Sequence, residues 1–390
     1  MGAVSNLIID DYPIFYSSKS YYEDVVNLIF LPEDFTKEKR ALKERNKLIW
    51  GDAYLEEEGL ETISNFITHS EICIDRLKIY GVTIEKAKTD FNKAVEMIKE
   101  DGLVDVFLKN EITFELYIEL INEIINSKYK DNSNQYTEFK DYLVEYDLMI
   151  EYQSIEYGLF SILSTRNDKS IVEYDINDLI KAGWTSENPK NDIKTKKIIV
   201  FTEGKTDTEF IKLGLSKFKP HLLNMYHFID FDNSRYEASA SRLVHSVKSF
   251  VGSGIDNLII AIFDNDVAGE KEMKILDNVI LPDNIKTLRY PDCNFLKNYP
   301  TIGSTGKTNM NINGLAGSIE MYLSEECLLE KGELSPIKWT GYVTQLNKYQ
   351  GVVTNKGNIQ KRFRKKMKVY DGEIWEELDL LLNSLFDAFK

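Results

Sequence analysis

Hydrophobic and polar residues follow two patterns along the chain, and the second half has the clearer one. Short, unbroken apolar runs predict buried strands at residues 196–201, 224–231, 257–263 and 285–290. Between them, hydrophobic residues recur at helical spacing over residues 207–218, 235–254 and 270–279. Unbroken apolar runs are typical of strands that are covered on both faces, as in a parallel sheet. The alternation predicts an α/β domain, a mostly parallel sheet flanked by helices with right-handed crossovers.

The first half has a mainly helical pattern, after a start that looks extended and is broken at Pro13. Hydrophobic residues recur at helical spacing from about residue 56 to residue 163. The stretch 61–81 is one example, and Gly81 is a suitable residue to end its helix. Residues 131–139 are typical of a loop between helices. These patterns predict a mainly α-helical N-terminal domain.

A polar segment, residues 185–196, contains Pro189 and precedes the change of pattern. Such segments are typical of domain boundaries. We therefore expect two domains, 1–192 and 193–390, the second with a basic C-terminal extension.

The composition is that of an ordinary protein with a hydrophobic core: 43% of the 390 residues are hydrophobic and 28% are charged. Cys73, Cys293 and Cys327 are too scattered for a disulfide framework or a zinc site. The start of the chain has no basic segment typical of a signal peptide, and no apolar run approaches membrane-spanning length. We expect a soluble, cytoplasmic protein with no membrane partner.

The charge is divided unevenly between the two halves. The net charge is −15. Residues 1–192 hold 21 Lys+Arg and 38 Asp+Glu, a net of −17, which leaves 27 and 25, a net of +2, for the remainder. A polyanionic partner such as a nucleic acid should therefore meet the second half.

Acidic residues follow two of the predicted strands. The first strand ends in "EGKTD", with Glu203 and Asp207, and the third ends in "DNDVAG", with Asp264, Asp266 and Gly269. Ligands of parallel α/β sheets bind beyond the carboxyl ends of the strands. If these strands are neighbours, the carboxylates converge there and repel one another, and Mg²⁺ would relieve the repulsion. The alternative for a single aspartate, Asp207 or Asp266, is that it caps a helix.

These two motifs resemble the EGxxD and DxDxxG motifs of the TOPRIM domain, which topoisomerases, bacterial primases and OLD-like nucleases share. The resemblance covers residues from about 193 to 335. It implies a phosphoryl-transfer site that uses Mg²⁺ or Mn²⁺, with Glu203 as acid/base or metal ligand and Asp264 and Asp266 as ligands. Asp207 matches the second acidic position of the first motif, and a metal contact is expected of it too.

The whole chain also resembles bacterial proteins with a HEPN/Toprim-associated N-terminal domain, through "LIIDDYPIF", "RNKLIWGDAY", the TOPRIM motifs, "GSIEMYL" and "YQGVVTNKGNIQ". This resemblance implies an antiphage-type nuclease that works beside an ATPase partner. Active HEPN ribonucleases carry an arginine followed after four to six residues by a histidine, and no such pair occurs here. The helical half is expected to be a sensing, docking or oligomerisation domain, with His69 a packed side chain.

Further candidates come later in the chain. Glu320, on a short helix expected after a loop at 303–317, fits the additional metal-binding glutamate that the OLD-like resemblance implies; the alternative is a solvated glutamate on the helix surface. Lys356 fits a lysine that neutralises developing charge on the phosphate and is counted with the catalytic group. Residues 356–368 contain seven basic residues and no acidic one, which favours contact with phosphates over a merely solvated helix face. The expected nucleic-acid-binding residues are Lys205, Lys307, Lys361, Arg362, Arg364 and Lys365.

Two other stretches are weaker candidates. Residues 301–308, "TIGSTGKT", nearly match a P-loop, but Thr301 replaces the first glycine and no apolar strand precedes it. Asp230 and Asp232 form a second Asp-x-Asp that lacks the following glycine, and neither is expected to be a primary ligand.

The leading hypothesis is a metal-dependent nuclease that cleaves DNA or RNA, tRNA among the candidates, as a toxic effector of antiphage defence. Two alternatives stay open: a primase-like nucleotidyl transferase, and a non-catalytic TOPRIM subunit that binds or regulates within an ATPase complex. A homo-oligomer is a further expectation.

Overall fold

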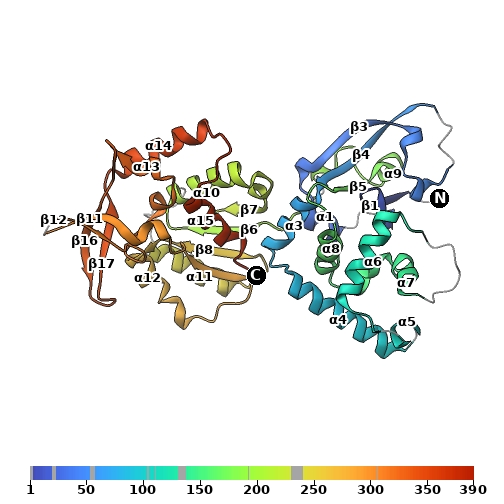
Figure 1. Cartoon of the computed structure of the whole chain (residues 1–390), viewed down its shortest axis with the longest axis horizontal. Coiled ribbons are helices and arrows are strands. Elements are labelled where there is room, and N and C mark those ends of the chain that lie inside the picture. Colours follow the sequence, from blue (N-terminus) through green and yellow to red (C-terminus); the bar gives the residue numbers. More distant parts are fainter. Residues whose placement is uncertain are drawn as a thin grey trace. The chain divides into compact units, whose positions relative to one another are not determined.

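A computed structural model of the chain describes residues 3–19, 23–52, 58–102, 105–109, 111–130, 138–191, 193–229, 240–304 and 306–390. The chain divides into two compact units, Met1–Lys196 with Lys390, and Lys197–Phe389 (Figure 1). Each unit is described by itself below.

The first unit contains a five-stranded antiparallel sheet in the order β2-β1-β5-β4-β3. Its strands are β1 Val4–Ile9, β2 Tyr12–Ser18, β3 Phe35–Ala41, β4 Leu60–His69 and β5 Ile171–Asp175. Residues far apart in sequence therefore share one sheet, because β5 lies between β1 and β4.

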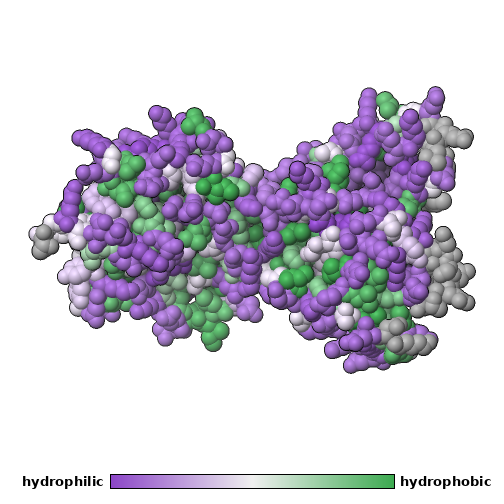
Figure 2. Space-filling view, viewed as in Figure 1, coloured by the Kyte–Doolittle hydropathy of each residue, from purple (hydrophilic) through white to green (hydrophobic). Residues whose placement is uncertain are grey.

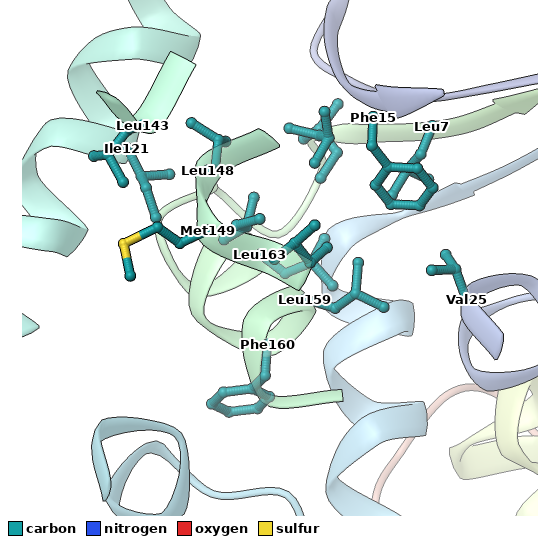
Figure 3. Close-up of a cluster of buried hydrophobic side chains, with 14 of the residues drawn as sticks. Leu7, Phe15, Val25, Ile121, Leu143, Leu148, Met149, Leu159, Phe160 and Leu163 are labelled. Atoms are coloured by element: carbon teal, nitrogen blue, oxygen red, sulfur yellow. The ribbon is translucent and has the colours of Figure 1, made fainter. Parts of the chain in front are cut away.

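Helices of the first unit share a hydrophobic core with this sheet. They are α1 Glu23–Ile29, α2 Lys47–Trp50, α3 Ser70–Ile79, α4 Ile84–Asp101, α5 Asp105–Lys109, α6 Phe114–Ser127, α7 Phe139–Glu145, α8 Ile155–Ser164 and α9 Asn177–Lys181. Figure 3 shows side chains of α8, such as Leu159 and Leu163, gathered with Leu7 and Phe15 of the sheet. These residues belong to one continuous hydrophobic core.

The prediction of a mainly helical first domain is wrong for residues 60–69, which form β4, because the unit combines helices with a sheet. Ile63 and Phe66 are three residues apart, so their spacing fits a helix as well as a strand. β4 lies between β3 and β5, so both its edges are paired and the segment is held as a strand. The predicted helix begins only at Ser70. His69 is also not packed: it is exposed, and its Nδ1 lies 3.2 Å from the carbonyl oxygen of Lys169.

The second unit contains the predicted parallel sheet, with four strands in the order β10-β8-β6-β7. They are β6 Ile198–Thr202, β7 Tyr226–Phe228, β8 Ile259–Phe263 and β10 Ile285–Arg289. Three helices connect them: α10 Lys205–Phe218, α11 Ala240–Ser253 and α12 Val267–Met273. The α11 helix packs on the sheet face that Phe201, Ala261 and Phe263 present, and Figure 1 shows α10 and α15 (Glu376–Phe386) on the other side.

The sheet has this form because its strands carry apolar residues on both faces. All five residues of β8 are buried, so the unbroken run identifies a central strand. Asp230, Asp232 and residues 235–239 lie outside the described residues.

A second sheet follows, in the order β12-β11-β16-β17. Its strands are β11 Tyr299–Gly303, β12 Gly306–Met310, β16 Ile337–Val343 and β17 Lys348–Val353. The remaining elements are β9 Asn265–Asp266, β13 Ala316–Gly317, η8 Ile319–Tyr322, α13 Glu325–Leu328, β14 Leu329–Glu330, β15 Glu333–Leu334 and α14 Lys356–Lys368. The expected loop 303–317 is wrong where β12 pairs with β11, which its polar, exposed residues did not indicate. Residues 301–303 thus pair with residues 306–308 in antiparallel strands, and no helix follows them as a P-loop requires.

Cys73, Cys293 and Cys327 are buried free cysteines. Hydrophilic residues cover most of the face shown in Figure 2, interrupted by smaller hydrophobic patches. Within the described ranges, no helix combines the length and the apolar character that crossing a membrane requires.

Candidate active site

Two acidic motifs meet at the carboxyl end of the parallel sheet. Strands β6 and β8 are parallel neighbours, with Thr202 opposite Ile262, so Glu203 and Asp264 leave the sheet at the same edge. The backbone N–H of Asp264 donates a hydrogen bond to Glu203 Oε1 at 2.9 Å. The sheet register therefore brings together residues from two separate strand ends.

Asp266 begins α12 and caps it. Its Oδ1 accepts a hydrogen bond from the N–H of Gly269 at 2.8 Å, and its Oδ2 accepts one from Gln350 Nε2 at 2.7 Å. The oxygen of the Gln350 amide in turn accepts the N–H of Ala268 at 3.0 Å. Gln350 lies on β17, so the second sheet holds the end of the DxD motif in place.

Gly269 permits a close approach that no other residue allows. A Cβ atom at this position would lie 2.5 Å from the carbonyl oxygen of Asp264, 3.3 Å from Glu203 Oε1 and 3.4 Å from Asp266 Oδ1. Glu203 and Asp266 therefore flank the same point. The glycine of the motif is explained by packing at the junction of the carboxylates.

Asp207 is in the first turn of α10 and is 8% exposed. The hydroxyl of Tyr290, at the end of β10, donates a hydrogen bond to its Oδ1 at 3.0 Å. A Cβ at Gly204 would lie 2.8 Å from Asp207 Oδ2, so the glycine leaves room for this carboxylate.

The carboxylates destabilise one another's charged forms. Burial, together with the charges of Asp266 and Asp207, raises the pKa of Glu203 to about 7. Burial, with the charge of Glu320, raises the pKa of Asp207 to about 6. Burial and the neighbouring carboxylates raise the pKa of Asp264 well above its usual value. Asp264 Oδ1 is buried and has no hydrogen-bond partner.

Glu320 and Lys356 form an ion pair next to this group. Glu320, on η8, is fully buried, and Lys356 Nζ lies 3.1 Å from its Oε2. Ser318 Oγ and Gln360 Nε2 also donate to the Glu320 carboxylate, at 2.8 and 2.7 Å. Burial opposes the charged form of Lys356, but Glu320, Asp264 and Asp207 outweigh it and raise the lysine pKa.

The expected nucleic-acid-binding residues divide into two groups. Lys307 pairs with Glu333 at 3.2 Å, Arg362 Nε donates to the carbonyl of Cys327 at 2.8 Å, and Arg364 forms a two-bond pair with Glu209. Lys205 opens α10 immediately after the EG turn. Lys361 and Lys365 are exposed, one turn apart on α14, whose buried face carries Ile359, Phe363 and Met367. Lys307, Arg362 and Arg364 thus make contacts within the unit.

Three residues of this region were not predicted from the sequence. Tyr290 and Gln350 contact Asp207 and Asp266. Asn265 is fully buried between the two aspartates, donates to Asp292 at 3.0 Å and accepts the N–H of Gly314 at 2.9 Å. Only Asn265 carried a signal, its place inside the DxD motif.

The residues fit a hard divalent cation in chemistry, since they offer carboxylate oxygens and one buried oxygen without a partner. They do not form a complete cage: within the described ranges, no three His, Cys, Asp or Glu side chains are already arranged as metal ligands. The oxygens of Asp266 are engaged by Gly269 and Gln350. A cation would have to compete with these protein donors.

A family model described as HEPN/Toprim N-terminal domain 1 matches residues 1–197. No curated protein and no solved structure matches the chain.

Proposed function

This chain belongs to the HEPN/Toprim N-terminal domain 1 family, and on that premise we propose that its second unit is a TOPRIM-type nuclease. It would hydrolyse phosphodiester bonds of DNA or RNA with Mg²⁺ or Mn²⁺, in the manner of OLD-like enzymes. The observation that carries the proposal is the group Glu203, Asp264 and Asp266, which follows neighbouring parallel strands and repels itself. Such a group costs stability unless a cation balances it, so its presence favours a functional role.

The metal would be held by Asp264 and Asp266, with Glu203 as a third ligand or as the acid/base, and Asp207 and Glu320 nearby. When bound, it would polarise the phosphodiester and make water a better nucleophile. The chain's own residues position this group: Gln350 holds Asp266, and the Glu203 carboxylate is fixed by the N–H of Asp264.

Lys356 would stabilise negative charge on the phosphate. Its Nζ is anchored by the buried Glu320, yet its side chain is 52% exposed and can meet a ligand. A positively charged side chain stabilises negative charge on a phosphate most when that side chain is already held in position.

Lys361 and Lys365 would contact a nucleic-acid backbone, since both are exposed on α14. We extend the proposal to Lys205, which lies beside Glu203. Contacts of this kind position the substrate and read no sequence.

The test is a cleavage panel of duplex DNA, single-stranded DNA, total RNA and tRNA, with Mg²⁺, Mn²⁺ or EDTA. Cleavage should require the metal and disappear in Glu203→Gln and Asp264→Asn. The matched control is Asp283→Asn, which changes an exposed aspartate of the same unit outside the acidic group. Activity that survives both site variants would refute the assignment.

A non-catalytic role is the second candidate, favoured by one observation: Asp266 is already satisfied by protein donors and no complete cage is formed in the described ranges. The unit would then bind or regulate within an ATPase complex. In that case Asp264→Asn would leave the biological function intact, while changes in the first unit would abolish it.

The biological setting that we propose is bacterial antiphage defence in the cytoplasm, beside an ATPase partner and as a homo-oligomer. Phage plating on cells that express the chain with its neighbouring genes tests this role. Protection should disappear in Glu203→Gln and persist in Asp283→Asn.

A further inference from the structure

A cavity in the first unit lies on the face of the five-stranded sheet that does not pack against the core. Its volume is about 540 Å³, within the usual range for small-molecule sites. Its walls come from β1, β3, β4 and β5, from α2 and α9, and from the end of α6. The cavity is thus built from segments spread over most of the unit.

The sequence of β5 explains why the cavity is polar. Side chains of a strand alternate between its two faces. Val172 and Tyr174 point into the hydrophobic core, while Glu173 and Asp175 line the cavity. A strand that carries acids on a largely buried face gains nothing in packing from them, so another role is expected.

Some of the charges in the cavity are already paired. Arg40 pairs with Glu173 at 2.9 Å, and Arg45 pairs with Glu61 at 2.5 Å. Asn65 also donates to Glu173, at 2.5 Å. These contacts engage Arg40, Arg45, Glu61 and Glu173 within the cavity wall.

Six other lining residues are charged but make no ion pair within the described ranges: the acids Asp11, Glu44, Asp175 and Asp178, and the lysines Lys47 and Lys128. Burial, with the charges of Glu173 and Asp178, raises the pKa of Asp175 to about 6. Burial also raises the pKa of Asp178. Unpaired acids and lysines in the wall of one cavity suit a ligand that carries both N–H donors and negative charge.

The cavity also offers a flat surface. The guanidinium carbon of Arg45 lies 5.0 Å from the ring centroid of Trp50, and both residues line the cavity. Leu48 and Ile63 add apolar contacts. Aromatic rings and guanidinium planes are the surfaces on which nucleobases stack.

We propose that this cavity binds a guanine nucleotide. The adjacent N–H donors of the guanine edge face Asp175 and Asp178, the phosphates face Lys47 and Lys128, and the base lies against Trp50. Guanine is favoured over adenine because its edge presents two neighbouring donor groups to a carboxylate. This site lies in the first unit and is independent of the proposed nuclease.

The test is isothermal titration of the full-length protein with guanosine, GMP, GTP, AMP and ATP. GMP and GTP should bind, and AMP and ATP should bind at least about tenfold more weakly. Asp178→Asn should weaken GMP about tenfold, because the amide keeps one acceptor oxygen but turns its NH2 donor toward the second donor of the base. Lys47→Ala should weaken GTP several-fold while leaving guanosine unchanged, since the lysine is assigned to the phosphates.

Matched controls are Lys43→Ala and Asp168→Asn, which change exposed residues outside the cavity and should bind like the parent. Asp264→Asn should also bind GMP normally, which separates this site from the carboxylates of the second unit. Circular dichroism confirms that each variant is folded. The proposal is overturned if GMP does not bind at about 1 mM, or if guanine and adenine nucleotides bind equally well. It is also overturned if Asp178→Asn binds GMP as tightly as the parent.

Discussion

Gly269→Ala is expected to damage the acidic site through a single methyl group. The added Cβ would lie 2.5 Å from the carbonyl oxygen of Asp264, whereas carbon and oxygen normally approach to about 3.3 Å. Backbone must therefore shift by roughly 0.8 Å, because the obstructing atom belongs to the main chain. The same Cβ lies 3.3 Å from Glu203 Oε1 and 3.4 Å from Asp266 Oδ1, so the shift falls on the carboxylates.

The magnitude follows from two opposing effects. Forcing a methyl group into a closely packed site typically costs about 1–3 kcal/mol. Alanine also favours a helix over glycine by up to about 1 kcal/mol, and Gly269 is in the first turn of α12. The net expectation is a loss of about 1–2 kcal/mol in the free energy of unfolding.

Gly252→Ala is the matched control. Gly252 lies on α11, and a Cβ there would have no neighbour within 4 Å. Only the helix preference remains, so this variant should gain about 0.5–1 kcal/mol. The two variants are compared by their urea midpoints and by metal-dependent cleavage. If Gly269→Ala unfolds at or above the midpoint of Gly252→Ala and cleaves normally, the argument from the Asp264 carbonyl is wrong.

Four other predictions concern charge. Lys356→Met should lower the free energy of unfolding by a few kcal/mol. The loss should be smaller than the roughly 3–5 kcal/mol typical of a broken buried ion pair, because the lysine is half exposed. Lys356→Arg keeps the positive charge and should retain most of the parent's stability in thermal unfolding. The folded-state pKa of Glu203 is raised from 4.5 to about 7, so the metal-free protein should lose stability as the pH rises from 4.5 to about 7. In Glu203→Gln the free energy of unfolding should fall less steeply with pH. An equally steep fall would contradict the assignment. Added Mg²⁺ at pH 7.5 should raise the melting temperature of the parent and not of Asp264→Asn. If nucleic acid binds α14, replacing Lys361 and Lys365 with alanine should reduce the salt slope of binding by about 2, measured by fluorescence anisotropy, whereas an unchanged slope would exclude both contacts.

Local pattern was sufficient for the parallel sheet of the second unit. The unbroken apolar residues of β6 and β8 predict central strands, and the structure contains them as neighbours. The same reasoning misjudged β4, because apolar residues three and four apart fit either a helix or a strand.

The residues of the candidate site also divide into those that the sequence predicts and those that only the structure shows. Glu203 and Asp264 could be named from their motifs, since each follows a strand within a short segment of sequence. Gln350 and Tyr290 could not, because they reach Asp266 and Asp207 from β17 and β10, and nothing in their own segments indicates these partners.

The sequence was enough to specify the second unit's parallel sheet, the positions of its acidic turns and the uneven charge of the two halves, because these depend on residues close together in the chain. Three features became visible only in the tertiary structure. They are the five-stranded sheet of the first unit, the hydrogen bond from Gln350 to Asp266 and the cavity beside Asp175. Each depends on pairing between distant segments, such as the insertion of β5 between β1 and β4. Side-chain spacing within a segment carries no information about which distant segment will cover it, so these features follow only from the assembled chain.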